Sequence, residues 1–183
     1  MMKTTIKLMA IMLGIFAVAF GTTSCDKIND ALEEHDPNDV KSVNVEYSMD
    51  LSQTWFDFYD ITVTYYDENG KENSLNVTEK WEYGFSVKPN KAPKNYVFTV
   101  VATPKKEHPE FDKAQYILSE DIQAKFYGLR YDGSIYKELW SDLHPVTLTW
   151  NDIYTFTDSQ MESYFVSGAR NLAQFTHSFD GDY

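Results

Sequence analysis

The chain has 183 residues and a formal net charge of −12, from 28 acidic and 16 basic side chains. An acidic surface repels phosphate backbones, which argues against a nucleic acid as a partner. The only cysteine is Cys25, so no disulfide can form within the chain and the core alone must stabilise the fold. The length is that of one ordinary domain.

Residues 1–24 have the composition of an export signal. Lys3 and Lys7 make the N-terminus basic, and residues 8–20 form an uninterrupted apolar run. A helix needs about 20 apolar residues to span a bilayer, so this shorter run fits the apolar part of a secretory signal. No acidic residue and two of the 16 basic ones lie before Cys25. Removing the signal would therefore leave 28 acidic and 14 basic residues, a net charge of −14.

The end of this segment carries a processing motif. Thr22-Thr23-Ser24-Cys25 resembles the lipobox of bacterial lipoproteins, with Ser24 and Thr23 at the small positions before the cysteine. Thr22 departs from the pattern, which usually has Leu or another aliphatic residue there. The resemblance implies that the Cys25 thiol receives a diacylglycerol and that the chain is cut before it; in this family the new amine is often acylated as well. Two or three acyl chains would anchor a protein stably, whereas one holds it only marginally.

The acidic, tyrosine-rich composition is similar to that of lipoproteins of the Bacteroidota. In that group, acidic residues just after the cysteine, such as Asp26, resemble signals for surface export. The resemblance implies an outer-membrane address, with the domain facing the periplasm or the cell surface. In enterobacterial lipoproteins an aspartate at this position implies retention at the inner membrane instead. Residues 25–40 are acidic and interrupted by Pro37, which predicts an extended tether below the domain.

From residue 41 onward the hydrophobic period is two, which predicts strands with one buried face. Asn69-Gly70 and Asp132-Gly133 predict hairpin turns. We expect about seven to nine short strands. The segments that show the alternation are 43–51, 61–66, a return strand through Leu75 and Val77, 81–87, 96–103, 122–131, 135–140 and 146–150. Without helices between these strands, the pattern predicts a mainly β domain over residues 41–183. An immunoglobulin-like antiparallel β-sandwich is the first choice and a lipocalin-like β-barrel the second.

The period changes to that of a helix near the C-terminus. Thr157 and Gln160 match a capping box, and apolar residues then recur on one helical face. The pattern predicts one C-terminal amphipathic helix over residues 158–173, with Gly168 as its weakest position.

No pattern of catalytic or metal-ligating residues appears. The four histidines are widely separated, and the sequence has no phosphate loop, nucleophile elbow or dinucleotide fingerprint. Residues 67–70 combine oxygen ligands with a glycine, but they lack the calcium-binding loop of twelve residues, and a hairpin explains them fully. We therefore expect no enzyme, no cofactor and no metal.

One aromatic cluster is the candidate ligand-binding site: Trp55, Phe56, Phe58 and Tyr59. Neighbouring rings in an extended segment cannot all face one core, so some of these rings are expected at the surface. Exposed Trp and Tyr rings stack on sugars or anchor proteins. The alternative is that the cluster closes the core of the sandwich.

Two functional hypotheses remain. The first is a membrane-anchored, non-catalytic lipoprotein whose exported β domain binds a ligand or partner, such as a glycan or a protein. The second is a structural subunit of a surface or fimbria-like assembly, which would need a donor strand or an open groove.

Overall fold

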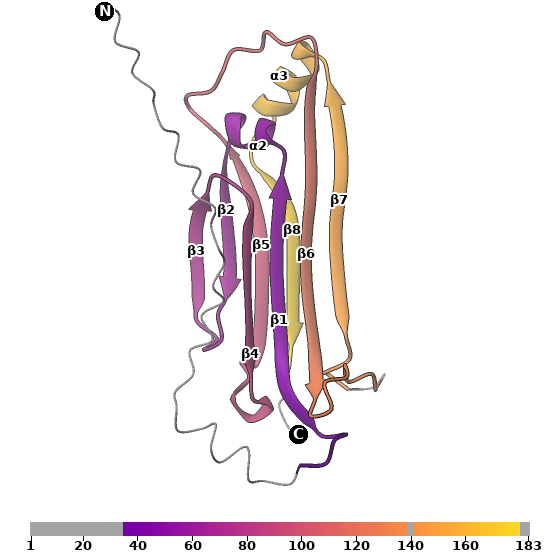
Figure 1. Ribbon diagram of the computed structural model, residues 1–183. Coiled ribbons are helices and arrows are strands. Elements are labelled where there is room, and N and C mark those ends of the chain that lie inside the picture. The colour runs from indigo at the N-terminus through magenta and orange to yellow at the C-terminus, as the bar shows by residue number, and fades with distance from the viewer. Residues whose placement is uncertain (1–34, 139–140, 180–183) are drawn as a thin grey trace, which may run out of the picture. The chain divides into compact units, whose positions relative to one another are not determined.

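The computed structural model describes residues 35–138 and 141–179 (Figure 1). The predicted signal, Cys25 and most of the predicted tether lie outside these residues. Asp36–Tyr183 forms one compact unit. Its described elements, in chain order, are β1 (Val40–Leu51), α2 (Gln53–Phe58), β2 (Tyr59–Tyr66), β3 (Glu72–Val77), β4 (Trp81–Val87), η1 (Pro89–Lys91), β5 (Asn95–Pro104), β6 (Tyr116–Arg130), β7 (Val146–Phe156), α3 (Asp158–Val166) and β8 (Arg170–Ser178).

The described strands form two antiparallel sheets of four. Sheet A has the order β4-β1-β6-β7, and sheet B has the order β3-β2-β5-β8. The sheets pack face to face and do not close on each other, so each keeps two edges (Figure 1). The predicted β-sandwich is confirmed, and the lipocalin-like barrel is wrong.

The pairing of the first five strands follows the immunoglobulin plan. β1 pairs with β4 in one sheet, and β2 pairs with β3 and β5 in the other, as strands B and E and strands C, C′ and F do in that plan. β8 lies beside β5, in the place of strand G. The departure is β6, which occupies the place of strand A although it comes late in the chain. β7 then extends the same sheet beyond β6.

The core lies between the two sheets, and the sequence alternation places it there. In β1 every second residue, from Val43 to Leu51, is buried. β6 repeats this pattern from Tyr116 to Gly128. Full burial of one large apolar side chain contributes about 1.5–3 kcal/mol, so these two central strands supply a large share of the stability.

Both predicted hairpin turns are present at one end of the sandwich. Gly70 and Gly133 adopt positive φ angles of 70° and 84°, which glycine adopts at no steric cost. The first turn joins β2 to β3 as predicted. After the second, the predicted return strand 135–140 is wrong over its described part, because only Ile135 bridges back to Leu129.

The C-terminal helix is shorter than predicted. α3 begins after Thr157, whose backbone N–H donates to Gln160 Oε1 at 2.9 Å, as the capping box predicts. It ends at Val166 instead of residue 173. Gly168 takes a φ of 101°, which turns the chain, and Arg170–Ser178 becomes β8. Phe175 and Ala173, the latter counted within the predicted helix, face the core as strand residues paired with β5.

The aromatic segment forms α2, which covers the end of the sandwich where α3 also lies (Figure 1). Trp55 and Phe58 are fully buried, and Tyr59 and Phe56 are 1% and 8% exposed. The hypothesis of an exposed binding platform is therefore wrong, and the alternative, that the cluster closes the core of the sandwich, is confirmed. The reason is that a helical turn, unlike a strand, points successive side chains around its axis. Here the rings meet neighbours on several sides; Phe58, for example, stacks on Phe111 at a centroid distance of 5.1 Å.

Candidate functional site

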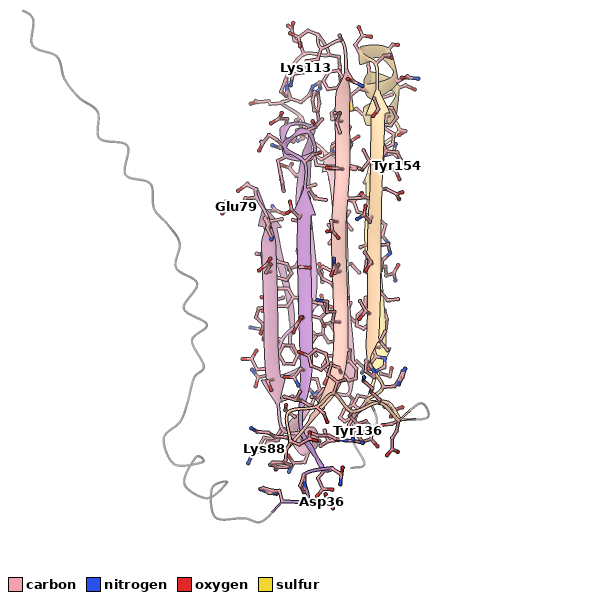
Figure 2. The ribbon with its side chains drawn as sticks, turned by 45° about the vertical axis from the view of Figure 1, so that its right-hand side comes forward. Asp36, Glu79, Lys88, Lys113, Tyr136 and Tyr154 are labelled. Atoms are coloured by element: carbon pink, nitrogen blue, oxygen red, sulfur yellow. The ribbon has the colours of Figure 1, made fainter. Side chains whose placement is uncertain are left out.

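A group of polar and aromatic side chains gathers where β6, β7, α3 and β8 meet. We call it the tyrosine–carboxylate corner and define it as Glu120, Asp152, Tyr154, Tyr164 and Arg170. Figure 2 shows Tyr154 toward the α3 end of β7, whereas Asp36 and Lys88 lie at the other end of the sandwich. The corner is therefore remote from the point at which the chain enters the fold.

The register of two strands and the turn after them bring the corner together. β6 and β7 pair without a register shift, which sets Glu120 opposite Asp152. Tyr154 lies two residues further along β7, and on the same face as Asp152 because side chains alternate in a strand. Since α3 follows β7 after one residue, it carries Tyr164 back over this face. The turn at Gly168 then starts β8 with Arg170.

Glu120 is a carboxyl group on the buried face of β6. It is 6% exposed, and its Oε2 atom has no hydrogen-bond partner among the described residues. Burial, and secondly the negative charge of Asp152 on the neighbouring strand, raise the pKa of Glu120 from its ordinary 4.5 to about 7. Desolvation and like-charge proximity both disfavour the ionised form. At neutral pH this group can thus donate as well as accept a hydrogen bond.

Aromatic rings border the two carboxyl groups. Tyr154 Oη donates to Asp152 Oδ2 at 3.2 Å. The Tyr164 ring lies 6.2 Å from the Tyr154 ring and 4.8 Å from the Phe156 ring, between centroids. Asp152 is exposed, and the three rings are partly exposed. The corner is therefore accessible to a ligand at its rings and at Asp152, while Glu120 lies behind them.

Arg170 holds Tyr164 in place. Its guanidinium carbon lies 3.5 Å from the centroid of the Tyr164 ring, a cation–π contact, and its Nη2 atom donates to the Tyr164 carbonyl oxygen at 2.8 Å. It also donates to Ser167 Oγ just beyond α3. These contacts fix the end of α3 against the start of β8, which orients the Tyr164 ring before any ligand binds.

The predicted aromatic cluster forms the buried support of this corner. The Trp55 ring makes an edge contact with the Tyr164 ring at 6.2 Å and a tilted contact with the Tyr59 ring at 5.1 Å. Phe58 is fully buried against Phe111, Tyr116 and Phe165, and Phe56 is 8% exposed. The structure therefore places the predicted residues beneath the candidate site, and none of the four forms its exposed surface.

Sequence reasoning missed all five residues of the corner. Asp152 and Tyr154 lie beyond residue 150, where the predicted last strand ended, and Arg170 lay within the predicted helix. One signal was present: a glutamate, Glu120, at a position that the alternation of β6 assigns to the buried face. Acidic residues are almost never fully buried unless paired, so this position could have been singled out.

The buried carboxyl group predicts a specific dependence of stability on pH. Between pH 4.5 and about 7 the unfolded chain releases the Glu120 proton while the folded chain keeps it, so the free energy of unfolding falls as the pH rises. Glu120→Gln keeps the shape and removes this loss. Relative to wild type, the variant should gain about 2–3 kcal/mol between pH 5 and pH 8, measured by urea unfolding at both values. An equal difference at the two pH values would contradict the assignment.

Within the described residues, no group of three or more His, Cys, Asp or Glu side chains is arranged to hold a metal ion. No helix in the same part of the chain has the length and hydropathy needed to cross a membrane. Comparison of the chain with family models, with curated proteins and with solved structures gave no match.

Proposed function

We propose that the protein is a lipid-anchored binding module of the bacterial cell envelope, whose β-sandwich binds a polyhydroxylated ligand, such as a glycan, at the tyrosine–carboxylate corner. The observation that carries the proposal is the corner itself: a buried carboxyl group, whose Oε2 atom has no hydrogen-bond partner in the described part of the chain, lies beside an accessible carboxylate and partly exposed rings. Rings can stack on the apolar face of a sugar, and carboxyl groups accept hydrogen bonds from its hydroxyls.

The position of the corner agrees with a lipid anchor on Cys25. The chain enters the sandwich at the end opposite α2 and α3, where Asp36 lies (Figure 2). The 16 residues from Cys25 to Val40 could extend to about 50 Å. The point at which such a tether joins the domain would therefore lie at the end of the sandwich away from the corner.

A binding experiment tests this site. The soluble chain from Asp26 onward contains the whole compact unit, and we expect it to bind on a glycan array. Asp152→Asn should weaken that binding at least tenfold, about 1.4 kcal/mol. The substitution removes the accessible negative charge, and it replaces the carboxylate that accepts the hydrogen bond from Tyr154 Oη with a weaker amide acceptor. Asp152 is exposed, so the free energy of unfolding should change by no more than about 0.5 kcal/mol.

Asp121→Asn is the matched control. Asp121 is also exposed and lies on β6 next to Glu120, but on the outer face of sheet A. Its replacement should leave ligand binding unchanged. Equal loss in both variants would show a general charge effect instead of a site at the corner, and an array without any bound glycan would contradict the ligand class.

The second candidate function, a structural subunit of a surface or fimbria-like assembly, needs a sheet edge that is open to another chain. One observation favours it: β7 is an edge strand that no other described strand pairs on its outer side.

A further inference from the structure

The four edges of the sandwich differ in how they are protected against pairing with another chain. In natural proteins an edge strand is prevented from pairing with another chain by being short, by carrying charged residues or proline, or by a β-bulge. β3 is only six residues long and begins with Glu72; β4 contains Glu82 and is followed by Pro89; β8 begins with Arg170 and has a register shift against β5. Each of these three edges carries at least one protective feature.

β7 lacks almost all of these features. It runs for 11 residues, Val146–Phe156, in continuous register with β6, and it contains no proline, lysine or arginine. Its only charged residue is Asp152. It is also the edge with the largest exposed apolar side chains, since Ile153 is 70% exposed on the outer face and Leu148 is 40% exposed on the inner face.

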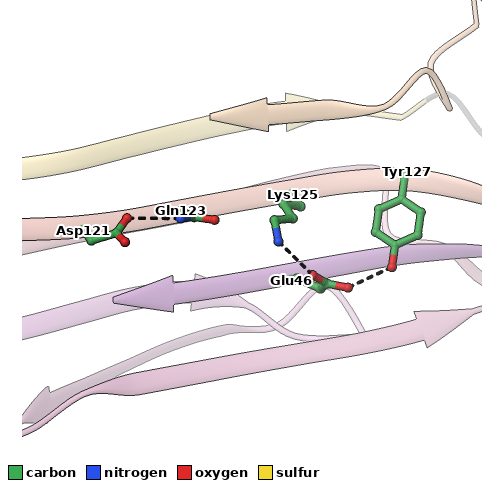
Figure 3. A network of polar contacts seen from close by, with 5 residues as sticks. All are labelled: Glu46, Asp121, Gln123, Lys125 and Tyr127. Atoms are coloured by element: carbon green, nitrogen blue, oxygen red, sulfur yellow. Dashed lines mark hydrogen bonds and ion pairs between the residues drawn. The ribbon is translucent and has the colours of Figure 1, made fainter. Parts of the chain in front are cut away.

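The neighbouring strands of sheet A show the contrast. On the outer face, Glu46 of β1 pairs with Lys125 of β6 at 3.6 Å and accepts a hydrogen bond from Tyr127 Oη at 2.8 Å (Figure 3). β7 carries no ionisable group on that face, where its residues are threonines, Asn151 and Ile153. A chain with a net charge of −12 thus has a nearly neutral strip along this one edge, where a second equally acidic molecule can approach.

We propose that β7 is a self-association edge, along which two copies of this chain pair their β7 strands antiparallel and join two sheets A into one sheet of eight strands. Pairing along the whole strand places its middle residue, Asn151, on the two-fold axis. Such an interface is self-complementary, as two-fold symmetry requires. This proposal goes beyond ligand binding and does not depend on it. Because Asp152 and Tyr154 belong both to the corner and to β7, the two corners of the dimer lie beside the two-fold axis.

The full-length register sets the most exposed apolar side chains of each copy against side chains of the second. Residues at equal distances on either side of Asn151 lie opposite each other, so Leu148 of one copy meets Tyr154 of the second, and Ile153 meets Thr149. Directly opposite side chains have Cβ atoms about 4.5–5.5 Å apart. The two most exposed apolar groups of the strand are covered, and the charged Asp152 side chains lie diagonally and not face to face.

Placing a charged residue at position 151, on the proposed two-fold axis, tests both which edge pairs and in which register. In sedimentation equilibrium, the soluble chain from Asp26 should form dimers in a concentration-dependent manner. Asn151→Lys sets two lysines opposite each other, and Asn151→Glu sets two glutamates opposite each other; because like charges at this position repel, each variant alone should dissociate at least tenfold more readily. An equimolar mixture of the two should recover a heterodimer.

The matched control is Ser86→Lys, which adds a lysine on the same outer face but at the β4 edge of sheet A, and it should leave the dimer unchanged. Circular dichroism confirms that each variant is folded. A wild-type chain that stays monomeric up to about 1 mM would overturn the proposal. So would lysine and glutamate variants that dimerise as well as wild type, or a mixture that does not recover the dimer. None of these measurements needs a ligand, so failure here leaves the binding proposal standing.

Discussion

Replacing Trp55 with alanine is expected to lower the free energy of unfolding by about 3–5 kcal/mol, the cost of deleting a large aromatic side chain from a core. Trp55 has no exposed surface, and its ring supports both the Tyr59 and the Tyr164 rings. A substitution at an exposed ring would cost no more than about 0.5 kcal/mol. The two values are far enough apart to separate a core residue from a binding platform in a urea unfolding curve.

Phe58→Ala should give a loss of similar size, because Phe58 is also fully buried and packs against Phe111, Tyr116 and Phe165. Glu79→Gln is the control. Glu79 is exposed and lies between β3 and β4, so its replacement should leave the midpoint of urea unfolding unchanged. A loss below 1 kcal/mol for both aromatic variants would contradict the burial of α2.

Removing the thiol of Cys25 is expected to have the largest effect on the protein in the cell. Cys25→Ala takes away the acceptor of the proposed diacylglycerol, so lipid attachment and the cut that follows it should both stop. Metabolic labelling with a palmitate analogue should then mark the wild-type protein and leave the variant unlabelled. The variant should accumulate as an unprocessed or soluble species.

The fold of this variant provides the control. Cys25 lies before the compact unit Asp36–Tyr183, so the purified wild-type and variant domains should give the same β-dominated circular dichroism spectrum. Label retained on the variant would refute the assignment of the lipid to Cys25.

The strands were predictable because each has one face in water and one in the core. β1 and β4 show this alternation clearly, and Asn69-Gly70 marks the hairpin between β2 and β3 directly. The number and spacing of the strands favoured a sandwich or a barrel, and they did not decide between open and closed sheets. The order of the strands did not, because nothing local indicates that β6 lies beside β1.

The failures have a common physical origin in tertiary context. Residues 158–173 fit a helical face, but the positive φ of Gly168 turns the chain just after α3, and residues 170–178 pair with β5 as a strand. The Trp55 segment has strand-like aromatics, yet it closes an end of the sandwich as a short helix. The candidate site was hidden for the same reason: Glu120, Asp152 and Tyr164 are distant in sequence, and only the β6–β7 register and the turn into α3 bring them together.

The central claim is that this sandwich is displayed from a lipid anchor at Cys25. The most direct test is mass spectrometry of the N-terminal peptide of the mature protein, isolated from the membrane fraction of cells that produce it. We expect a chain that begins at Cys25, with a diacylglycerol on the sulfur and a further acyl chain on the amine. A mature chain that begins at another residue, or a Cys25 with a free thiol, would contradict the claim.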